Sequence, residues 1–168
     1  MRRGVMVGVV CVLLMVSLAP AGHAESRVVK DPPKDAQRIV DVVRAKFTNG
    51  DKAFRAVVKF RRLAKSGLAL NVGVDSYDVA EWRKYNVGIS VNKKGKTFVS
   101  LIMMDEDGGA EVACKKASAD WNPGKRGTVR LYAPRSCFDL SATVAMDALA
   151  VVEGDVGDTT EMVVVAQG

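Results

Sequence analysis

The residues best suited to chemistry in this sequence are acidic side chains in a short turn. The segment 105–109 (DEDGG) could place carboxylates around a Ca²⁺ ion, with Asp105 and Asp107 as ligands. An EF-hand loop, however, needs a longer run of alternating acids and a distal glutamate, and this segment has neither. We therefore interpret it as a solvated hairpin turn, keep Asp105 and Asp107 as weak calcium candidates, and expect no metal site and no cofactor.

Acidic residues elsewhere suggest two other kinds of site. Glu153, Asp155 and Asp158 form a second acidic loop, which would become a better calcium candidate only if it met the first loop in space. Asp41 and Asp147 lie within otherwise apolar segments, where burial could raise the pKa of a carboxyl group and suit it to acid catalysis, as in a glycosidase. The competing interpretation is that both face solvent, or accept hydrogen bonds from the backbone or from arginine.

Aromatic residues offer a candidate sugar-binding platform. Trp82, Tyr85 and Trp121 have ring faces suited to stacking against a sugar. Trp82 and Trp121 fall in predicted loops, where binding residues often lie. The alternative is that these rings pack in the core or against loops, as a tryptophan of a β-sandwich often does.

Basic residues gather in one predicted strand and one predicted turn. They could attract anionic cell-wall polymers or lipid headgroups over long range. No nucleic-acid-binding motif is present, and we expect no nucleic acid partner. The alternative is a solvated strand face and a charged turn that discourages edge pairing. The residues are Arg55, Lys59, Arg61, Arg62, Lys93, Lys94 and Lys96.

The N-terminus has the pattern of a secretory signal peptide. Two arginines precede an almost entirely apolar run, Val5–Leu18, and small residues follow it. We expect cleavage after Ala24, with cleavage after Ala21 as the alternative. The run is shorter than the roughly 20 residues of a membrane span. We therefore expect a secreted protein with no stable membrane span after the signal, residues 1–24, is removed.

Loss of that signal also removes His23, the single histidine of the chain. Catalytic units of the Ser-His-Asp or Cys-His type need an imidazole base, and zinc sites nearly always use histidine or several cysteines. We therefore expect a protein that is not an enzyme. Two cysteines remain, Cys114 and Cys137, and in an exported chain they most simply form one disulfide bond.

The rest of the chain alternates between apolar and polar residues with the period of two that is typical of strands. The segment 39–60 shows this best and predicts a β-hairpin around Asn49-Gly50, although residues 36–47 also fit a helix. The segment 98–104 is nearly continuous apolar, as in a strand buried on both faces. In all we predict strands at 36–47, 54–60, 68–74, 85–91, 98–104, 110–114, 128–133, 143–152 and 162–166.

These strands predict an all-β fold, an antiparallel β-sandwich of about eight to nine strands, with a closed β-barrel as the alternative. We expect one domain at 35–168, after an exposed lead-in at 25–34 that contains two consecutive prolines. The segment 115–127 is predicted as a loop. Pro134 should open a single helical turn that carries Cys137.

Four features together resemble a known group of proteins. They are Asp31-Pro32 with Asp35, the basic segment 54–63 (FRAVVKFRRL), a strand ending at Asp75, and the corner 133–138 (APRSCF) with Cys114 upstream. The chain resembles small secreted β-sandwich proteins of unknown function that are common in actinobacteria. The resemblance implies a sandwich fold and no particular activity. The final strand departs from that group, because Met162–Val165 contains no aromatic residue.

The sequence therefore favours a secreted, non-enzymatic β-sandwich that binds a ligand or a cell surface weakly, with a cell-wall polymer or glycan as the partner. The alternative function is a small hydrolase that depends on carboxylates, such as a glycosidase.

Overall fold

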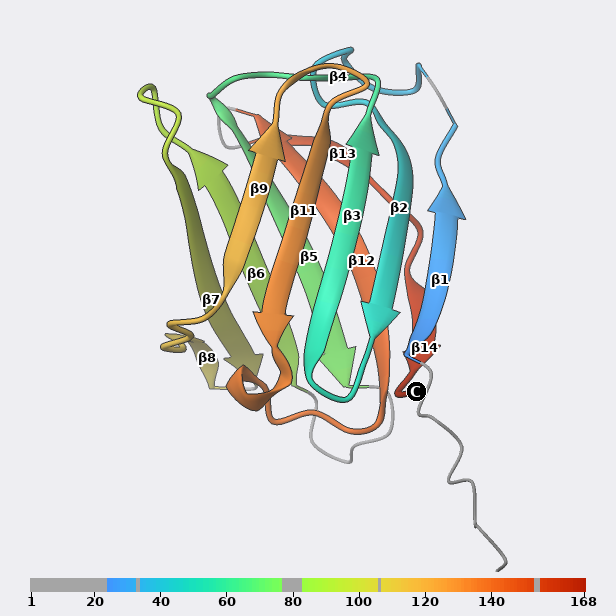
Figure 1. Ribbon diagram of the computed structural model, residues 1–168, viewed down its shortest axis with the longest axis vertical. Helices are drawn as coiled ribbons and strands as arrows, with labels where there is room; N and C mark the ends of the chain where they lie inside the picture. The colour runs from blue at the N-terminus through green and yellow to red at the C-terminus, as the bar shows by residue number, and fades with distance from the viewer. Residues whose placement is uncertain (1–23, 33, 77–82, 106, 153–154) are drawn as a thin grey trace, which may run out of the picture.

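The computed structural model describes residues 24–168 except 33, 77–82, 106 and 153–154 (Figure 1). The predicted signal peptide, apart from Ala24, therefore lies outside the described residues, as does Trp82. Two antiparallel sheets pack face to face, and within the described ranges neither closes into a barrel. The predicted β-sandwich is confirmed.

The first sheet contains the hairpin predicted from the segment 39–60. Its order is β1-β2-β3-β11-β9. The strands are β1 (Glu25–Lys30), β2 (Val42–Asn49), β3 (Ala53–Phe60), β9 (Ser118–Asn122) and β11 (Thr128–Pro134). Strands β2 and β3 pair in antiparallel register from Asn49 opposite Phe54 to Val42 opposite Phe60.

The second sheet has the order β13-β12-β5-β6-β7-β8, with β14 also paired to β12. Its strands are β5 (Leu68–Ser76), β6 (Lys84–Val91), β7 (Thr97–Asp105), β8 (Gly108–Glu111), β12 (Thr143–Val152), β13 (Asp155–Thr159) and β14 (Val163–Ala166). Two short strands, β4 (Arg62–Leu63) and β10 (Gly124–Lys125), pair with each other near one end of the sandwich. A single 3₁₀ turn, η1 (Arg135–Cys137), follows Pro134 as predicted.

Alternation along β3 shows how the sequence builds the core. Phe54, Ala56, Val58 and Phe60 are buried between the sheets, whereas Arg55 and Lys59 are exposed. Residues of β5, including Leu70 and Val72, pack in the same core cluster from the facing sheet. Burial of such a side chain contributes roughly 1.5–3 kcal/mol.

Several predicted boundaries need correction. The lead-in at 25–34 begins with a strand, because β1 pairs with β2 along its whole length, although most of its side chains are exposed as expected. The segment 36–47 is neither one strand nor one helix: the amides of Val40 and Asp41 both donate to the Gln37 carbonyl in a tight turn, and β2 starts only at Val42.

Two further segments differ from the prediction. The predicted loop at 115–127 contains β9 and β10. The segment 98–104 is not buried on both faces, since Phe98 and Ile102 are 45% and 41% exposed. The described residues form fourteen strands, and the five that were not predicted are β1, β4, β9, β10 and β13.

Candidate functional site

A basic groove lies at the end of the first sheet where β3 ends and β11 begins (Figure 1). Its volume is about 390 Å³, and five of its eight lining side chains are cationic. The lining residues are Arg38, Val43, Lys59, Phe60, Arg61, Lys125, Arg126 and Thr128. Three chain segments meet here: the turn before β2, the end of β3, and the connection between β10 and β11.

Backbone hydrogen bonds fix these three segments against one another. The Arg61 amide donates to the Asp41 carbonyl at 2.8 Å, and the Arg126 amide donates to the Arg61 carbonyl at 3.1 Å. Gly127 allows the close approach, because a Cβ there would lie 2.4 Å from the Leu63 Cβ. The backbone therefore holds the basic side chains at the groove even though the side chains themselves are solvated.

The positive charge of the groove is only partly compensated. Arg61 forms a salt bridge with the buried Asp41 carboxylate, with 3.3 Å between Nη1 and Oδ2. Lys59 lies directly opposite Arg44 in the register of β2 and β3. Like charges at opposite strand positions repel each other, and an anion bound between them would relieve that repulsion. The groove thus favours an anionic ligand with an apolar patch, since the half-buried Val43 forms part of its wall.

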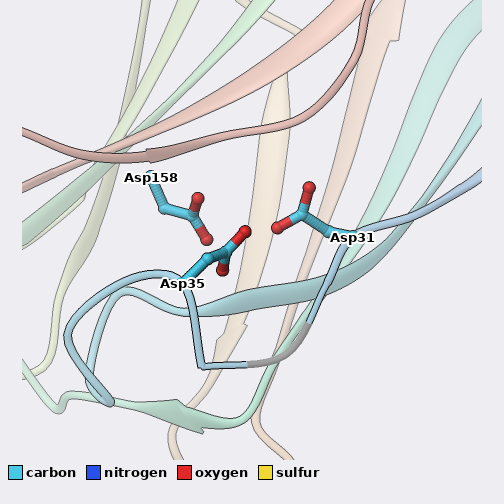
Figure 2. Close-up of side chains that lie close together, drawn as sticks. All are labelled: Asp31, Asp35 and Asp158. Carbon is cyan, nitrogen blue, oxygen red and sulfur yellow. The ribbon is translucent and has the colours of Figure 1, made fainter.

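Three aspartates that are distant in sequence meet at the loop before β2 (Figure 2). Asp31 follows β1, Asp35 lies in the turn before β2, and Asp158 belongs to β13. One carboxylate oxygen from each lies within 4.8 Å of the other two. We call these three residues the acidic cluster. Asp158 is anchored by two amides, since Oδ2 accepts from Val42 at 2.6 Å and Oδ1 from Thr159 at 2.9 Å.

Asp41 is a fourth acid of the same region and is completely buried. Its Oδ2 accepts hydrogen bonds from the Lys34 amide at 3.0 Å and from Arg61 at 3.3 Å. The sequence suggested hydrogen bonding to the backbone or to arginine as the alternative to acid catalysis by Asp41, and the structure shows both kinds of hydrogen bond. Its Oδ1 has no hydrogen-bond partner in the described part of the chain, and the same is true of the buried Oδ2 of Asp31.

The cluster alters the acidity of its members. Burial, followed by the charges of Asp158, Asp35 and Asp41, raises the pKa of Asp31 to about 6. Burial also raises the pKa of Asp158, against the opposing effect of the Val42 and Thr159 amides. Ionised carboxylates in the cluster therefore destabilise one another at neutral pH.

Replacement of Asp31 by asparagine should stabilise the protein at neutral pH in metal-free buffer. Since the pKa of Asp31 is about 6 in the folded protein and 3.8 ordinarily, folding free energy is lost as the pH rises above 3.8, and the loss is complete above about pH 6. We expect Asp31→Asn to gain about 1–2 kcal/mol after allowance for solvent screening. Urea denaturation should show this gain at neutral pH and almost none near pH 3.8. An equal gain at both pH values, or any gain from the exposed turn variant Asp107→Asn, would contradict the assignment.

The predicted aromatic platform is not assembled in the described residues. Tyr85 is only 2% exposed, packs edge-on against Phe138 with ring centroids 5.1 Å apart, and accepts a hydrogen bond from the Asp139 amide. Trp121 lies in β9 rather than in a loop, is half-buried, and donates from its indole nitrogen to the Ala64 carbonyl at 2.8 Å. These two rings belong to different sheets, and Trp82 lies outside the described residues.

The other predicted acids occupy separate places. The Oδ1 of Asp105 accepts from the Asp107 amide at 3.0 Å, as in the hairpin turn expected between β7 and β8. The two acidic loops do not meet, because β8 and β13 are at opposite ends of the second sheet. Asp147 is half-buried in β12, and its carboxylate lies over Gly73 of β5. Glu153 lies outside the described residues, and of the other acids only Asp158 enters the cluster.

The predicted basic residues divide between the groove and other surfaces. Lys59 and Arg61 line the groove, whereas Arg55 lies over the Tyr132 ring and Lys96 over the Phe98 ring. Sequence reasoning missed the groove residues Arg38, Lys125 and Arg126, because Arg38 precedes β2, Lys125 lies in the two-residue strand β10 that pairs with β4, and Arg126 follows β10. These three residues belong to no periodic segment that would place them beside Lys59 and Arg61.

The predicted disulfide between Cys114 and Cys137 is present, with 5.6 Å between the two Cα atoms. It lies at the end of the sandwich away from the groove, where η1 follows β11 (Figure 1). A disulfide bond is compatible with an extracellular location. Among the described residues there is no helix that is both long and apolar enough to cross a membrane.

Comparison with known proteins identifies no relative: no family model, no curated protein and no solved structure matches the chain.

Proposed function

We propose that the protein is a secreted, non-enzymatic binding module whose basic groove binds an anionic polymer of the cell surface. The observation that carries this proposal is the convergence of five cationic side chains on one groove of about 390 Å³. A secretory signal predicted at 1–24 and the disulfide bond support an extracytoplasmic site of action. Cell-wall polymers with repeated phosphate or carboxylate groups are the anions that such a protein would encounter.

The geometry of the groove fits a flexible chain better than a small ion. Its cations come from three separate segments, and in the part of the chain that the structure describes only Arg61 among them forms a salt bridge, with Asp41. Several solvated cations each attract a repeating anion weakly, so the affinity should depend on their sum and on ionic strength. The half-buried Val43 adds an apolar contact for the backbone of the polymer.

A binding assay with defined polymers tests the proposal. We expect the purified protein to bind immobilised poly(glycerol phosphate) in biolayer interferometry and not to bind neutral dextran. Affinity should fall at least about tenfold between about 50 mM and about 500 mM NaCl, because the Debye length shortens to a few ångströms. Equal binding to dextran, or binding that is unaffected by salt, would refute an anion-binding groove.

The hydrolase alternative has one observation in its favour. Asp31, whose pKa is raised to about 6, can hold a proton close to neutral pH beside Asp158 and Asp35. A protonated carboxyl next to an ionised one is the arrangement of glycosidases. Incubation with cell-wall glycan and measurement of new reducing ends separates the two functions. If the wild-type protein released glycan fragments and the Asp158→Asn variant did not, the protein would be a hydrolase and the binding proposal would be wrong.

A further inference from the structure

We propose that the acidic cluster binds a Ca²⁺ ion that joins the loop 31–41 to β13. Asp31 and Asp35 contribute from the first half of that loop, and Asp158 contributes from β13. Figure 2 shows the three carboxylates directed toward a common space. This inference does not depend on the ligand of the basic groove.

The cluster carries negative charge that the described residues leave uncompensated. No salt bridge in this part of the structure joins a lysine or arginine to Asp31, Asp35 or Asp158. Acidic side chains this close would ordinarily spread apart on an exposed surface. Here Asp158 cannot move away, because the Val42 and Thr159 amides hold its two oxygens.

A second, independent observation comes from Asp41, which is outside the cluster but is linked to it through the backbone. Its side chain is completely buried, and its Oδ1 has no partner among the described residues. The backbone places it there: Asp41 accepts from the amide of Lys34, which precedes Asp35, and the amide that follows Asp41 donates to Asp158. Its charge acts on both Asp31 and Asp158.

An unpaired, buried carboxylate oxygen is costly unless a positive charge lies nearby. The buried Oδ2 of Asp31 is a second oxygen of this kind, and it belongs to the cluster itself. A cation held by Asp31, Asp35 and Asp158 would compensate the Asp31 oxygen directly, and it would add to the partial compensation that Arg61 already gives Asp41. The same ion would offset the mutual repulsion of the three ligands.

The chemistry of the donors identifies the ion. All three are carboxylate oxygens, which prefer hard cations such as Ca²⁺ and Mg²⁺. Oxygens up to 4.8 Å apart can lie on opposite sides of Ca²⁺, whose ligands are at about 2.3–2.6 Å, but Mg²⁺ at about 2.0–2.1 Å would have to draw them closer. Water would complete the coordination. We expect a Kd for Ca²⁺ of about 10⁻⁴–10⁻³ M, which is the range of extracellular calcium-binding modules.

Thermal unfolding with the metal alone tests the site. We expect about 10 mM CaCl₂ to raise the Tm of the metal-free protein by about 5 °C or more, and MgCl₂ to raise it less. Calorimetric titration should give one Ca²⁺ per chain. The variant Asp35→Asn should lose most of the shift, and since Asp35 is exposed it should still fold. The matched control Asp107→Asn, in the other acidic turn, should keep the full shift.

Two results would overturn the inference: no Tm shift at about 10 mM CaCl₂, or an equal shift in Asp35→Asn and Asp107→Asn. A shift of the same size with MgCl₂ would overturn the assignment to calcium. Polymer binding serves as a separate readout, so failure of the groove proposal leaves a calcium shift intact, and failure of calcium binding leaves salt-dependent polymer binding intact.

Discussion

Replacement of Lys59 and Lys125 together by glutamate should lower the affinity for poly(glycerol phosphate) about 100-fold, because each change removes an attraction and adds a repulsion worth together about 1–1.5 kcal/mol. Both residues line the basic groove, one from β3 and one from β10. Both side chains are exposed, so the double variant should fold normally. Biolayer interferometry at low salt measures the effect directly.

The control for this experiment is Lys93→Glu with Lys94→Glu, which changes the net charge by the same amount. These lysines are exposed in the turn between β6 and β7 of the other sheet and do not line the groove. Their replacement should lower affinity by less than about threefold, through long-range attraction alone. If the two double variants reduced polymer binding equally, general attraction by the net positive charge of the protein, and not the groove, would explain the binding.

Loss of the disulfide should have the largest effect on stability. Replacement of both Cys114 and Cys137 by serine should lower the free energy of unfolding by about 3 kcal/mol, because the bond closes a loop between residues 23 positions apart and so restricts the unfolded chain. The bond also ties the chain after β8 to the corner after β11, and thus links the two sheets. Urea denaturation of both proteins, with and without reductant, measures this difference.

Reductant provides the internal control for that measurement. It should destabilise the wild-type protein by about the same 3 kcal/mol and leave the double serine variant unchanged. A loss below about 1 kcal/mol would mean that the unfolded chain is already compact between the two positions. The variant should keep its calcium shift and its polymer binding, because the groove and the acidic cluster lie at the other end of the sandwich.

The sheet positions could be read from local sequence because burial of one face leaves a period of two. Phe54, Ala56, Val58 and Phe60 are buried in β3 as that period predicts. The period of two did not predict strands that are held by backbone hydrogen bonds and bury few side chains. The strand β1 buries almost only Val29, yet it is paired along its length with β2. The opposite error concerns β7, which was predicted to be buried on both faces although its apolar residues Phe98 and Ile102 are exposed.

The candidate site was less accessible to sequence reasoning than the fold. Lys59 and Arg61 could be named because the first lies on a strand with a visible period and the second follows that strand directly, but Arg126 lies in a turn where its role depends on a hydrogen bond to Arg61. The aromatic interpretation failed for Tyr85 because the sequence does not distinguish a ring in the core from a ring in a cleft.

By itself, the sequence determined the class of fold, the β2–β3 hairpin and the disulfide, because alternation, turn residues and a pair of cysteines are local or countable properties. Only the tertiary structure decided where the basic groove and the acidic cluster form. Asp158 is 127 positions from Asp31 and 123 from Asp35 in the chain, and it reaches them because β13 packs beside the loop before β2. No local sequence pattern indicates where solvated charged side chains will meet. Their meeting points depend on how the two sheets pack and how the loops between the strands are placed.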